Sequence, residues 1–249
     1  MASKSADIKR SGLGRSLSVS LAGLRAGGAF ALDGAIARLR GDGQPGLDSP
    51  FARREARRFV RELGRLKGTY VKIGQMLALL GEHFLPPVLT EALHELESQT
   101  QPLPFKAIEP QLRAALGNAL EELSIEHEAI AAASLAQVHR ATVKATGEQI
   151  CLKVQYPGLA DVIDADFDAV VRMLLLARWI KAGRDLDDWL TSMREQLHNE
   201  IDYAREAAMG DRVEALLADS ADALTDRGIR YHVPRRYAQY CADTVLAME

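Results

Sequence analysis

The fold is decided by a stretch that reads as two strands and a turn: Gln137-Val138-His139-Arg140-Ala141-Thr142-Val143, Ala145-Thr146-Gly147, then Gln149-Ile150-Cys151-Leu152-Lys153-Val154. Apolar and polar residues alternate loosely on both sides of a short segment that contains glycine, and this pattern predicts a β-hairpin. Residues 229–234 and 243–248 predict two further strands. Lys153 lies between apolar neighbours, where a buried ammonium group needs a counter-charge or solvent.

Helical periodicity dominates the rest of the chain, with apolar residues every three or four positions. The predicted helices span about residues 51–80, 87–97, 107–117, 159–181 and 186–217. Pro87 suits the first turn of its helix, and a loop at residues 41–46 is the clearest break. The sequence therefore predicts an α+β fold, mostly helical, with an antiparallel sheet.

The composition, 47% hydrophobic and 26% charged, is that of a soluble globular protein. Two cysteines, Cys151 and Cys241, indicate a reducing compartment rather than a disulfide framework. No uninterrupted apolar run of about 18 residues predicts a membrane span. The six histidines show no metal-ligand spacing, so the sequence predicts no metal site from them.

Positive charge is concentrated near the start of the chain, where residues 1–70 carry 14 Lys and Arg against 6 Asp and Glu. The densest cluster is Arg53, Arg54, Arg57, Arg58, Arg61 and Arg65. These residues form either a solvated helix face or a surface attracted to an anionic membrane. Nucleic acid is not predicted as a partner, because no aromatic platform or binding motif accompanies the charge.

The order of the predicted elements is that of the small lobe of a protein kinase: a hairpin, an acidic helix and two strands. In that comparison Cys151-Leu152-Lys153-Val154 takes the place of the Val-Ala-Ile-Lys strand, whose lysine binds the α- and β-phosphates of ATP. The glycine-rich loop is absent, and Ala131-Ala132-Ala133-Ser134 stands in its place. Each alanine Cβ limits positive φ and the approach of backbone N–H groups to phosphates.

Three motifs together resemble the UbiB (AarF) family of atypical protein-kinase-like proteins: Lys72-Ile73-Gly74-Gln75, the alanine-rich loop Ala131–Ser134, and Glu200-Ile201-Asp202 with Glu206 beyond it. The resemblance implies binding of ATP and Mg²⁺ through the alanine-rich loop, Lys153 and Glu206. It also implies a helix bearing Lys72, Gly74 and Gln75 that covers the peptide cleft, which disfavours ordinary protein phosphorylation.

Two ion-pair assignments are possible for these residues. We expect Lys153 to pair with Glu206, and Lys72 and Gln75 to meet Glu200 and Asp202. The swapped pairing of Lys153 with Glu200 stays open. In a continuous helix over residues 186–217, Asp202 and Glu206 share one face and Glu200 lies on another.

The predicted domains are a basic, partly disordered segment at 1–46 with one amphipathic helix, a helical extension at 47–125 and a kinase-like small lobe at 126–249. The resemblance implies an atypical kinase-like ATPase or phosphotransferase linked to isoprenoid-quinone (ubiquinone) biosynthesis. It would be cytoplasmic and peripheral at the inner membrane, with a nucleotide, the anionic membrane surface and quinone precursors or quinone-biosynthesis proteins as partners. Residues 245–249 resemble the strand that enters the hinge, so the catalytic large lobe and its metal ligands are expected to be lacking and the chain inactive alone. The alternative is a non-catalytic, pseudokinase-like module that binds lipid or a partner.

Overall fold

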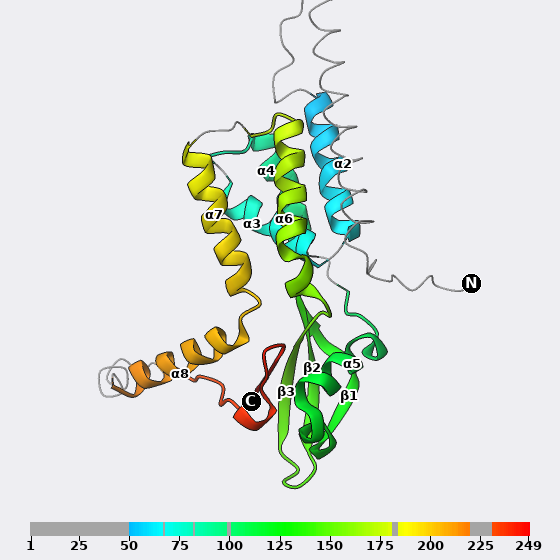
Figure 1. Cartoon of the computed structure of the whole chain (residues 1–249), viewed down its shortest axis with the longest axis vertical. Helices are drawn as coiled ribbons and strands as arrows, with labels where there is room; N and C mark the ends of the chain where they lie inside the picture. The colour runs from blue at the N-terminus through cyan, green and yellow to red at the C-terminus, as the bar shows by residue number, and fades with distance from the viewer. Residues whose placement is uncertain (1–49, 67, 82, 99–100, 181–183, 220–230) are drawn as a thin grey trace, which may run out of the picture. The chain divides into compact units, whose positions relative to one another are not determined.

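The computed structural model describes residues 50–66, 68–81, 83–98, 101–180, 184–219 and 231–249 (Figure 1). The chain divides into two compact units, each built from two stretches. The helical unit comprises residues 1–100 and 158–197, and the sheet unit comprises residues 101–157 and 198–249. Each unit combines two separate stretches of the sequence, whereas the predicted domains are consecutive. The division into domains at 1–46, 47–125 and 126–249 stays a prediction. The predicted basic segment at 1–46 lies outside the described residues.

The helical unit contains α2 (Pro50–Leu66), α3 (Thr69–Leu80), α4 (Pro87–Leu93), the 3₁₀ helix η1 (His94–Ser98), α6 (Leu159–Leu176) and most of α7 (Arg184–Asn199). Helix α2 packs on α4, and α3 packs on α6. The largest fully buried side chains of this unit are Leu63, Tyr70, Ile73, Leu77, Leu89, Leu93, Ile163 and Phe167. Each leucine, isoleucine and phenylalanine of this set contributes about 1.5–3 kcal/mol by its removal from water.

The single helix predicted over residues 51–80 is wrong, because the chain breaks between α2 and α3. Gly68 at the break has φ 58°, in the left-handed region that side chains disfavour. Its carbonyl accepts hydrogen bonds from the N–H groups of Val71 and Lys72, which begin α3. Apolar spacing continues on both sides of Gly68, so periodicity alone did not reveal the break.

The sheet unit contains the four-stranded antiparallel sheet β1 (Leu123–Ala132), β2 (Ala136–Val143), β3 (Gln149–Gln155) and β4 (Val245–Met248), in that spatial order. The predicted hairpin is confirmed as β2 and β3, whose turn carries Gly147 at φ 74°. The strand predicted at residues 229–234 is wrong where it is described: residues 231–234 form no strand, and only an isolated bridge joins Arg236 to Met248. The α+β fold class is confirmed.

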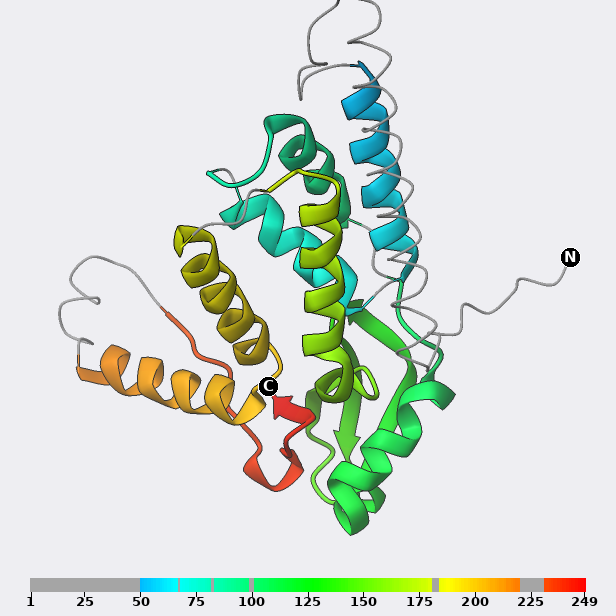
Figure 2. The same cartoon turned by 45° about the horizontal axis from the view of Figure 1, so that its top comes forward.

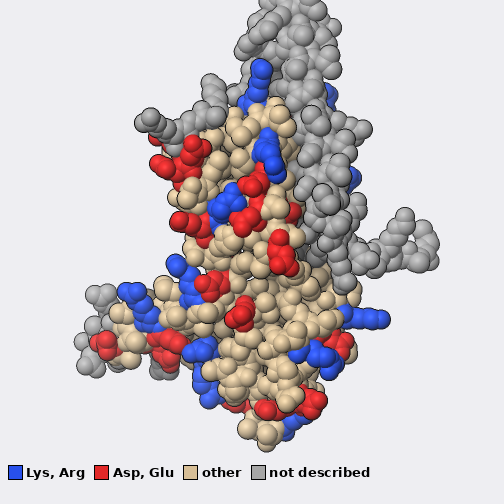
Figure 3. Space-filling view, in the orientation of Figure 1, with Lys and Arg blue, Asp and Glu red and all other residues tan. Residues whose placement is uncertain are grey.

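Helix α5 (Phe105–Leu116) covers one face of this sheet (Figure 2). The helix packs on this face: its Ile108, Leu112 and Leu116 share one hydrophobic core with Ile150, Leu152 and Val154 of β3. Lys153 alternates with Leu152 and Val154, so it projects from the other face, in one row with Val138 and Leu246. Helix α8 (Tyr203–Asp219) contacts β4 and carries side chains of both charge signs, which are interspersed in Figure 3.

The long helix predicted over residues 186–217 is also wrong, because α7 ends at Asn199 and α8 begins at Tyr203. Asp202 caps α8: its Oδ1 accepts the N–H of Arg205 at 2.8 Å, and its carbonyl accepts the N–H of Glu206 at 3.0 Å. Aspartate is a favoured N-cap, because it satisfies donors that the first turn leaves unpaired. Among the described residues, no helix is both long and apolar enough to cross a membrane.

Candidate functional site

Lys153 and Glu206 form an ion pair within the sheet unit. The Nζ atom of Lys153 donates to both carboxylate oxygens of Glu206, at 2.7 Å to Oε1 and 2.6 Å to Oε2. Their side chains are 29% and 41% exposed, so the pair is open to solvent and to a ligand. Strand β3 supplies the cation from inside the sheet, and the first turn of α8 supplies the anion. Of the two pairings left open by the sequence, the structure contains Lys153–Glu206.

Tyr203 lies beneath the same ammonium group. Lys153 Nζ is 4.9 Å from the centre of the Tyr203 ring, a cation–π distance. Tyr203 is 2% exposed, and this burial, reinforced by the negative charge of Glu206, raises the pKa of its hydroxyl. The phenol is therefore neutral, and the negative charge beside Lys153 belongs to Glu206.

The alanine-rich loop links β1 to β2 in a tight turn. Ala131 and Ala132 are the last residues of β1 and pair with Val138 and Gln137, and the N–H of Ala133 donates to the carbonyl of Ala136 at 2.7 Å. Ala131 and Ala133 are exposed, whereas Ser134 is buried. Among the described residues other than glycine, only Arg178 has positive φ, so the loop turns without the conformations that glycine supplies.

Tyr156 fixes this loop to the end of β3. Its hydroxyl donates to the carbonyl of Ala133 at 3.1 Å, and its N–H donates to the carbonyl of Leu135 at 2.9 Å. Burial raises the pKa of Tyr156 to about 12, so the hydroxyl keeps its proton at neutral pH. The loop is therefore anchored to the same strand that carries Lys153.

Asp202 and Glu206 do not share a face of one long helix with Glu200 on another, because α7 ends before Glu200 and α8 begins after Asp202; this corrects the predicted arrangement. Glu200 and Asp202 lie between α7 and α8, where Asp202 serves as the cap described above. Lys72, Gly74 and Gln75 lie on α3 in the helical unit. The contacts of Lys72 and Gln75 with Glu200 and Asp202 stay predictions.

Within the helical unit, Gly74 and Gln75 both meet Leu96 of η1. A Cβ on Gly74 would lie 2.3 Å from Leu96 Cδ1, which is closer than real contacts allow. The side-chain amide of Gln75 donates to the Leu96 carbonyl at 3.5 Å. This packing role was not predicted, because nothing in the sequence pairs Leu96 with α3.

Comparison with known proteins places this site in a family. The model of the ABC1 atypical kinase-like domain matches residues 95–249, which include the alanine-rich loop, Lys153 and Glu206. The chain belongs to the ABC1 atypical kinase-like family. The predicted resemblance to the UbiB proteins is confirmed.

Curated relatives carry matching names. The chain is 34% identical over 189 residues to "Atypical kinase coq-8, mitochondrial" of Caenorhabditis elegans, covering 74% of this chain and 24% of that protein. It is 30% identical over 193 residues to "Atypical kinase COQ8, mitochondrial" of Saccharomyces cerevisiae, covering 77% and 37%. It is 31% identical over 199 residues to "Probable protein kinase UbiB" of Cronobacter sakazakii, covering 76% and 34%. The chain thus spans between a quarter and somewhat over a third of the length of these relatives.

A buried network in the ABC1 domain was missed by the sequence analysis. Gln137 Oε1 accepts the N–H of Leu103 at 2.7 Å, and Gln137 Nε2 donates to the Leu103 carbonyl at 3.1 Å. The same Nε2 lies 2.8 Å from His139 Nε2, and His139 Nδ1 lies 2.8 Å from the carbonyl of Glu126. Because a carbonyl only accepts, Nδ1 carries the proton and Nε2 accepts from Gln137. Burial lowers the pKa of His139, and the nearby His127 lowers it further.

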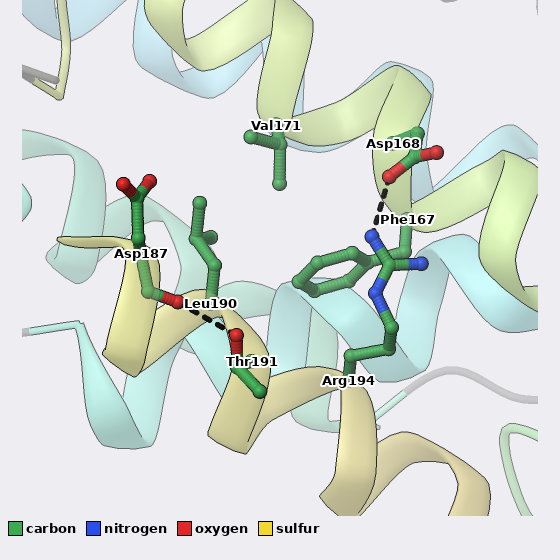
Figure 4. A pocket seen from close by; sticks show the side chains of 7 residues that line it. All are labelled: Phe167, Asp168, Val171, Asp187, Leu190, Thr191 and Arg194. Carbon is green, nitrogen blue, oxygen red and sulfur yellow. Dashed lines mark hydrogen bonds and ion pairs between the residues drawn. The ribbon is translucent and has the colours of Figure 1, made fainter.

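Asp164 and Asp168 of α6 have a structural role in the helical unit. Arg194 of α7 donates to Asp164 at 2.7 Å and to Asp168 at 2.5 Å, and its guanidinium lies over the ring of Phe167. These contacts join α6 to α7 beside a shallow pocket of about 240 Å³. Figure 4 shows Asp187 and Arg194 at opposite ends of this pocket, with Val171 and Leu190 between them.

The described residues fit the phosphate of a nucleotide better than its metal. Lys153 offers a partly exposed ammonium group on the open face of the sheet. No group of three or more His, Cys, Asp or Glu side chains in the described ranges could hold a metal ion. The ammonium group of Lys153 has the charge that a phosphate needs, and its side chain is 29% exposed.

Proposed function

We propose that this chain supplies the nucleotide-binding small lobe of an atypical kinase-like ATPase or phosphotransferase. The observation that carries the proposal is the two-point contact of Lys153 Nζ with both oxygens of Glu206. A strand lysine paired with a helix glutamate is the arrangement that aligns the phosphates of ATP in kinases. Membership in the ABC1 atypical kinase-like family supports this assignment.

Lys153 would bind the α- and β-phosphate oxygens of ATP. Glu206 and the ring of Tyr203 hold the ammonium group in place, so that little side-chain entropy is lost when a phosphate arrives. Bound ATP with Mg²⁺ would supply the transferable γ-phosphoryl group. Lys153 and the alanine-rich loop Ala131–Ser134 would orient the nucleotide beneath the sheet.

The alanine side chains would make the loop a weaker phosphate cradle than a glycine-rich loop. The N–H of Ala133 already donates to Ala136, and each Cβ keeps a phosphate further from the backbone. Binding would then depend more on Lys153 than in an ordinary kinase.

The proposed setting is isoprenoid-quinone biosynthesis at the inner membrane, with the protein peripheral on the cytoplasmic side and acting with quinone precursors or quinone-biosynthesis proteins. The family resemblance carries the quinone link. The names of the relatives, atypical kinases called COQ8 and a probable kinase called UbiB, support the kinase part.

A lipid- or partner-binding module without catalysis is the second candidate. It is favoured by α2, where Arg53, Arg58 and Arg61 are exposed. Such a module would bind anionic surfaces equally well with or without Lys153.

Calorimetric titration of the 249-residue chain with ATP, with and without Mg²⁺, tests the proposal. Lys153→Met should weaken binding at least tenfold, because the phosphates lose their cation. Lys106→Met on α5 is the matched control, since Lys106 is exposed and lies outside the site, and it should leave affinity unchanged. Equal affinity in the wild type and Lys153→Met would overturn the nucleotide assignment and favour the binding module.

A further inference from the structure

We propose that Gln155 is the positioning residue that holds α8 in register with β3 and so maintains the Lys153–Glu206 pair. For its nucleotide readout this inference rests on the proposed function. Gln155 is the last residue of β3 and is 4% exposed. Its side-chain Nε2 donates to the carbonyl of Ile201 at 2.5 Å and to the carbonyl of Asp243 at 3.3 Å.

The alternation of the strand places Gln155 on the face of the sheet from which Lys153 projects. The two residues are two positions apart; Lys153 contacts the first turn of α8, and Gln155 contacts the turn that precedes it. Lys153 meets Tyr203 and Glu206, and Gln155 meets Ile201, two residues before Tyr203. Strand β3 is thus joined to α8 and the turn before it by two contacts: the Lys153–Glu206 ion pair and the neutral hydrogen bond from Gln155 to Ile201.

The main chain of Gln155 is fixed as firmly as its side chain. Its N–H donates to the carbonyl of Thr244 at 3.0 Å, and its carbonyl accepts from the side chain of Gln111 on α5 at 2.8 Å. One residue therefore connects α5, β3, the turn before α8 and the turn before β4. Because its N–H, its carbonyl and its side chain are all hydrogen-bonded, Gln155 is rigid enough to fix the position of α8 relative to β3.

Only a side chain with two N–H donors suits this position. Ile201 and Asp243 both present carbonyl oxygens, which accept and cannot donate. A glutamate would place a charged acceptor against them, and a methionine would fill the volume without a donor. Gln155→Met adds no charge near Lys153 and Glu206, so a loss at the ion pair in this variant would be transmitted through the turn at residues 200–202.

The test compares Gln155→Met and Gln155→Glu with Gln149→Met, an exposed glutamine at the other end of β3. The first readout is the Lys153–Glu206 coupling, obtained from urea unfolding of Lys153→Met, Glu206→Gln and the double variant. In the Gln155→Met background this coupling should fall to less than half of its wild-type value, and in the Gln149→Met background it should stay the same. Unchanged coupling in Gln155→Met would overturn the inference. This readout needs no nucleotide, so it separates failure here from failure of the proposed function.

Amide hydrogen exchange gives a second, local readout. The N–H of Glu206, bonded to the Asp202 carbonyl, should lose protection at least tenfold in Gln155→Met, while the amides of β2 keep theirs. Equal loss in β2 would mean that Gln155 serves the fold in general, and the positioning role would be rejected. ATP affinity should drop several-fold in Gln155→Met and more in Gln155→Glu. An affinity equal to that of Gln149→Met would contradict the role in nucleotide binding.

Discussion

Leu96 occupies the space where a side chain on Gly74 would lie: its Cδ1 is 2.3 Å from the position of a Cβ. A Cβ on Gly64 of α2 would lie 3.4 Å from Cδ2 of the same leucine, an ordinary van der Waals contact. The missing side chain at Gly74 is therefore what lets α3 close on η1 around Leu96. The glycine of the Lys-x-Gly-Gln motif therefore has a packing reason inside the helical unit.

Gly74→Ala should destabilise the chain by about 1–3 kcal/mol, as expected for overpacking, even though alanine is the better helix former. Gly210→Ala on α8 is the control, because nothing lies within 4 Å of its Cβ, and it should gain about 0.5–1 kcal/mol. Urea unfolding measures both. Adding Leu96→Ala to Gly74→Ala should cost less than the sum of the single changes, and simple additivity would show that the two positions do not clash.

Lys72 tests the predicted link to Glu200 and Asp202. Double-mutant cycles of Lys72→Ala with Glu200→Gln, and with Asp202→Asn, measure the coupling. Asparagine caps helices about as well as aspartate, so Asp202→Asn should spare the start of α8. At least one cycle should exceed about 1 kcal/mol, above the few tenths typical of exposed pairs. Two cycles near zero would remove the predicted contact.

His139 should make stability depend on pH in a defined direction. Its pKa in the folded chain is lowered from 6.5, chiefly by burial, so the folded state holds it neutral. The unfolded state binds its proton first, and stability that is complete above about pH 6.5 is lost as the pH falls toward the folded pKa. Protonation would also set an N–H on Nε2 against the amide of Gln137.

Urea unfolding between pH 5 and 8 measures this dependence. His139→Gln should flatten the loss on the acid side, whereas His83→Gln, at an exposed histidine of the helical unit, should leave it as in the wild type. A wild-type stability that rises on acidification through this range would contradict the neutral, accepting Nε2.

We predict that the basic residues within 20–65, which include the arginines of α2, bind anionic liposomes in a salt-sensitive way; residues 20–49 lie outside the described residues. Replacement of Arg53, Arg54, Arg57 and Arg58 by Gln should abolish sedimentation with the vesicles, because it removes positive charges that attract the anionic lipid. Added salt should weaken the binding of the wild type, since exposed charges are screened within about 8 Å at physiological ionic strength. The control replaces Lys106, Arg205 and Arg212 in the sheet unit. Binding that persists at about 1 M salt would exclude an electrostatic origin.

The hairpin of β2 and β3 was predictable, because two-residue alternation and Gly147 are both local signals. The Lys153–Glu206 pair was predictable only through the family resemblance, since 53 positions separate the partners. Both helix breaks were missed, at Gly68 and at Glu200–Asp202, because apolar periodicity continues across them. Gln155 was missed for another reason: its partners are main-chain carbonyls, which every residue carries, so no sequence pattern marks them.

The break before α8 has an electrostatic consequence for Glu206. A helix running unbroken from residue 186 would place this carboxylate mid-helix, whereas the cap at Asp202 places it in the first turn. The peptide dipoles of a helix sum to a partial positive charge at its amino end, which favours a nearby carboxylate by about 0.3–1 kcal/mol. The turn thus gives Glu206 a second source of positive potential, one that would remain while Lys153 turns toward a phosphate.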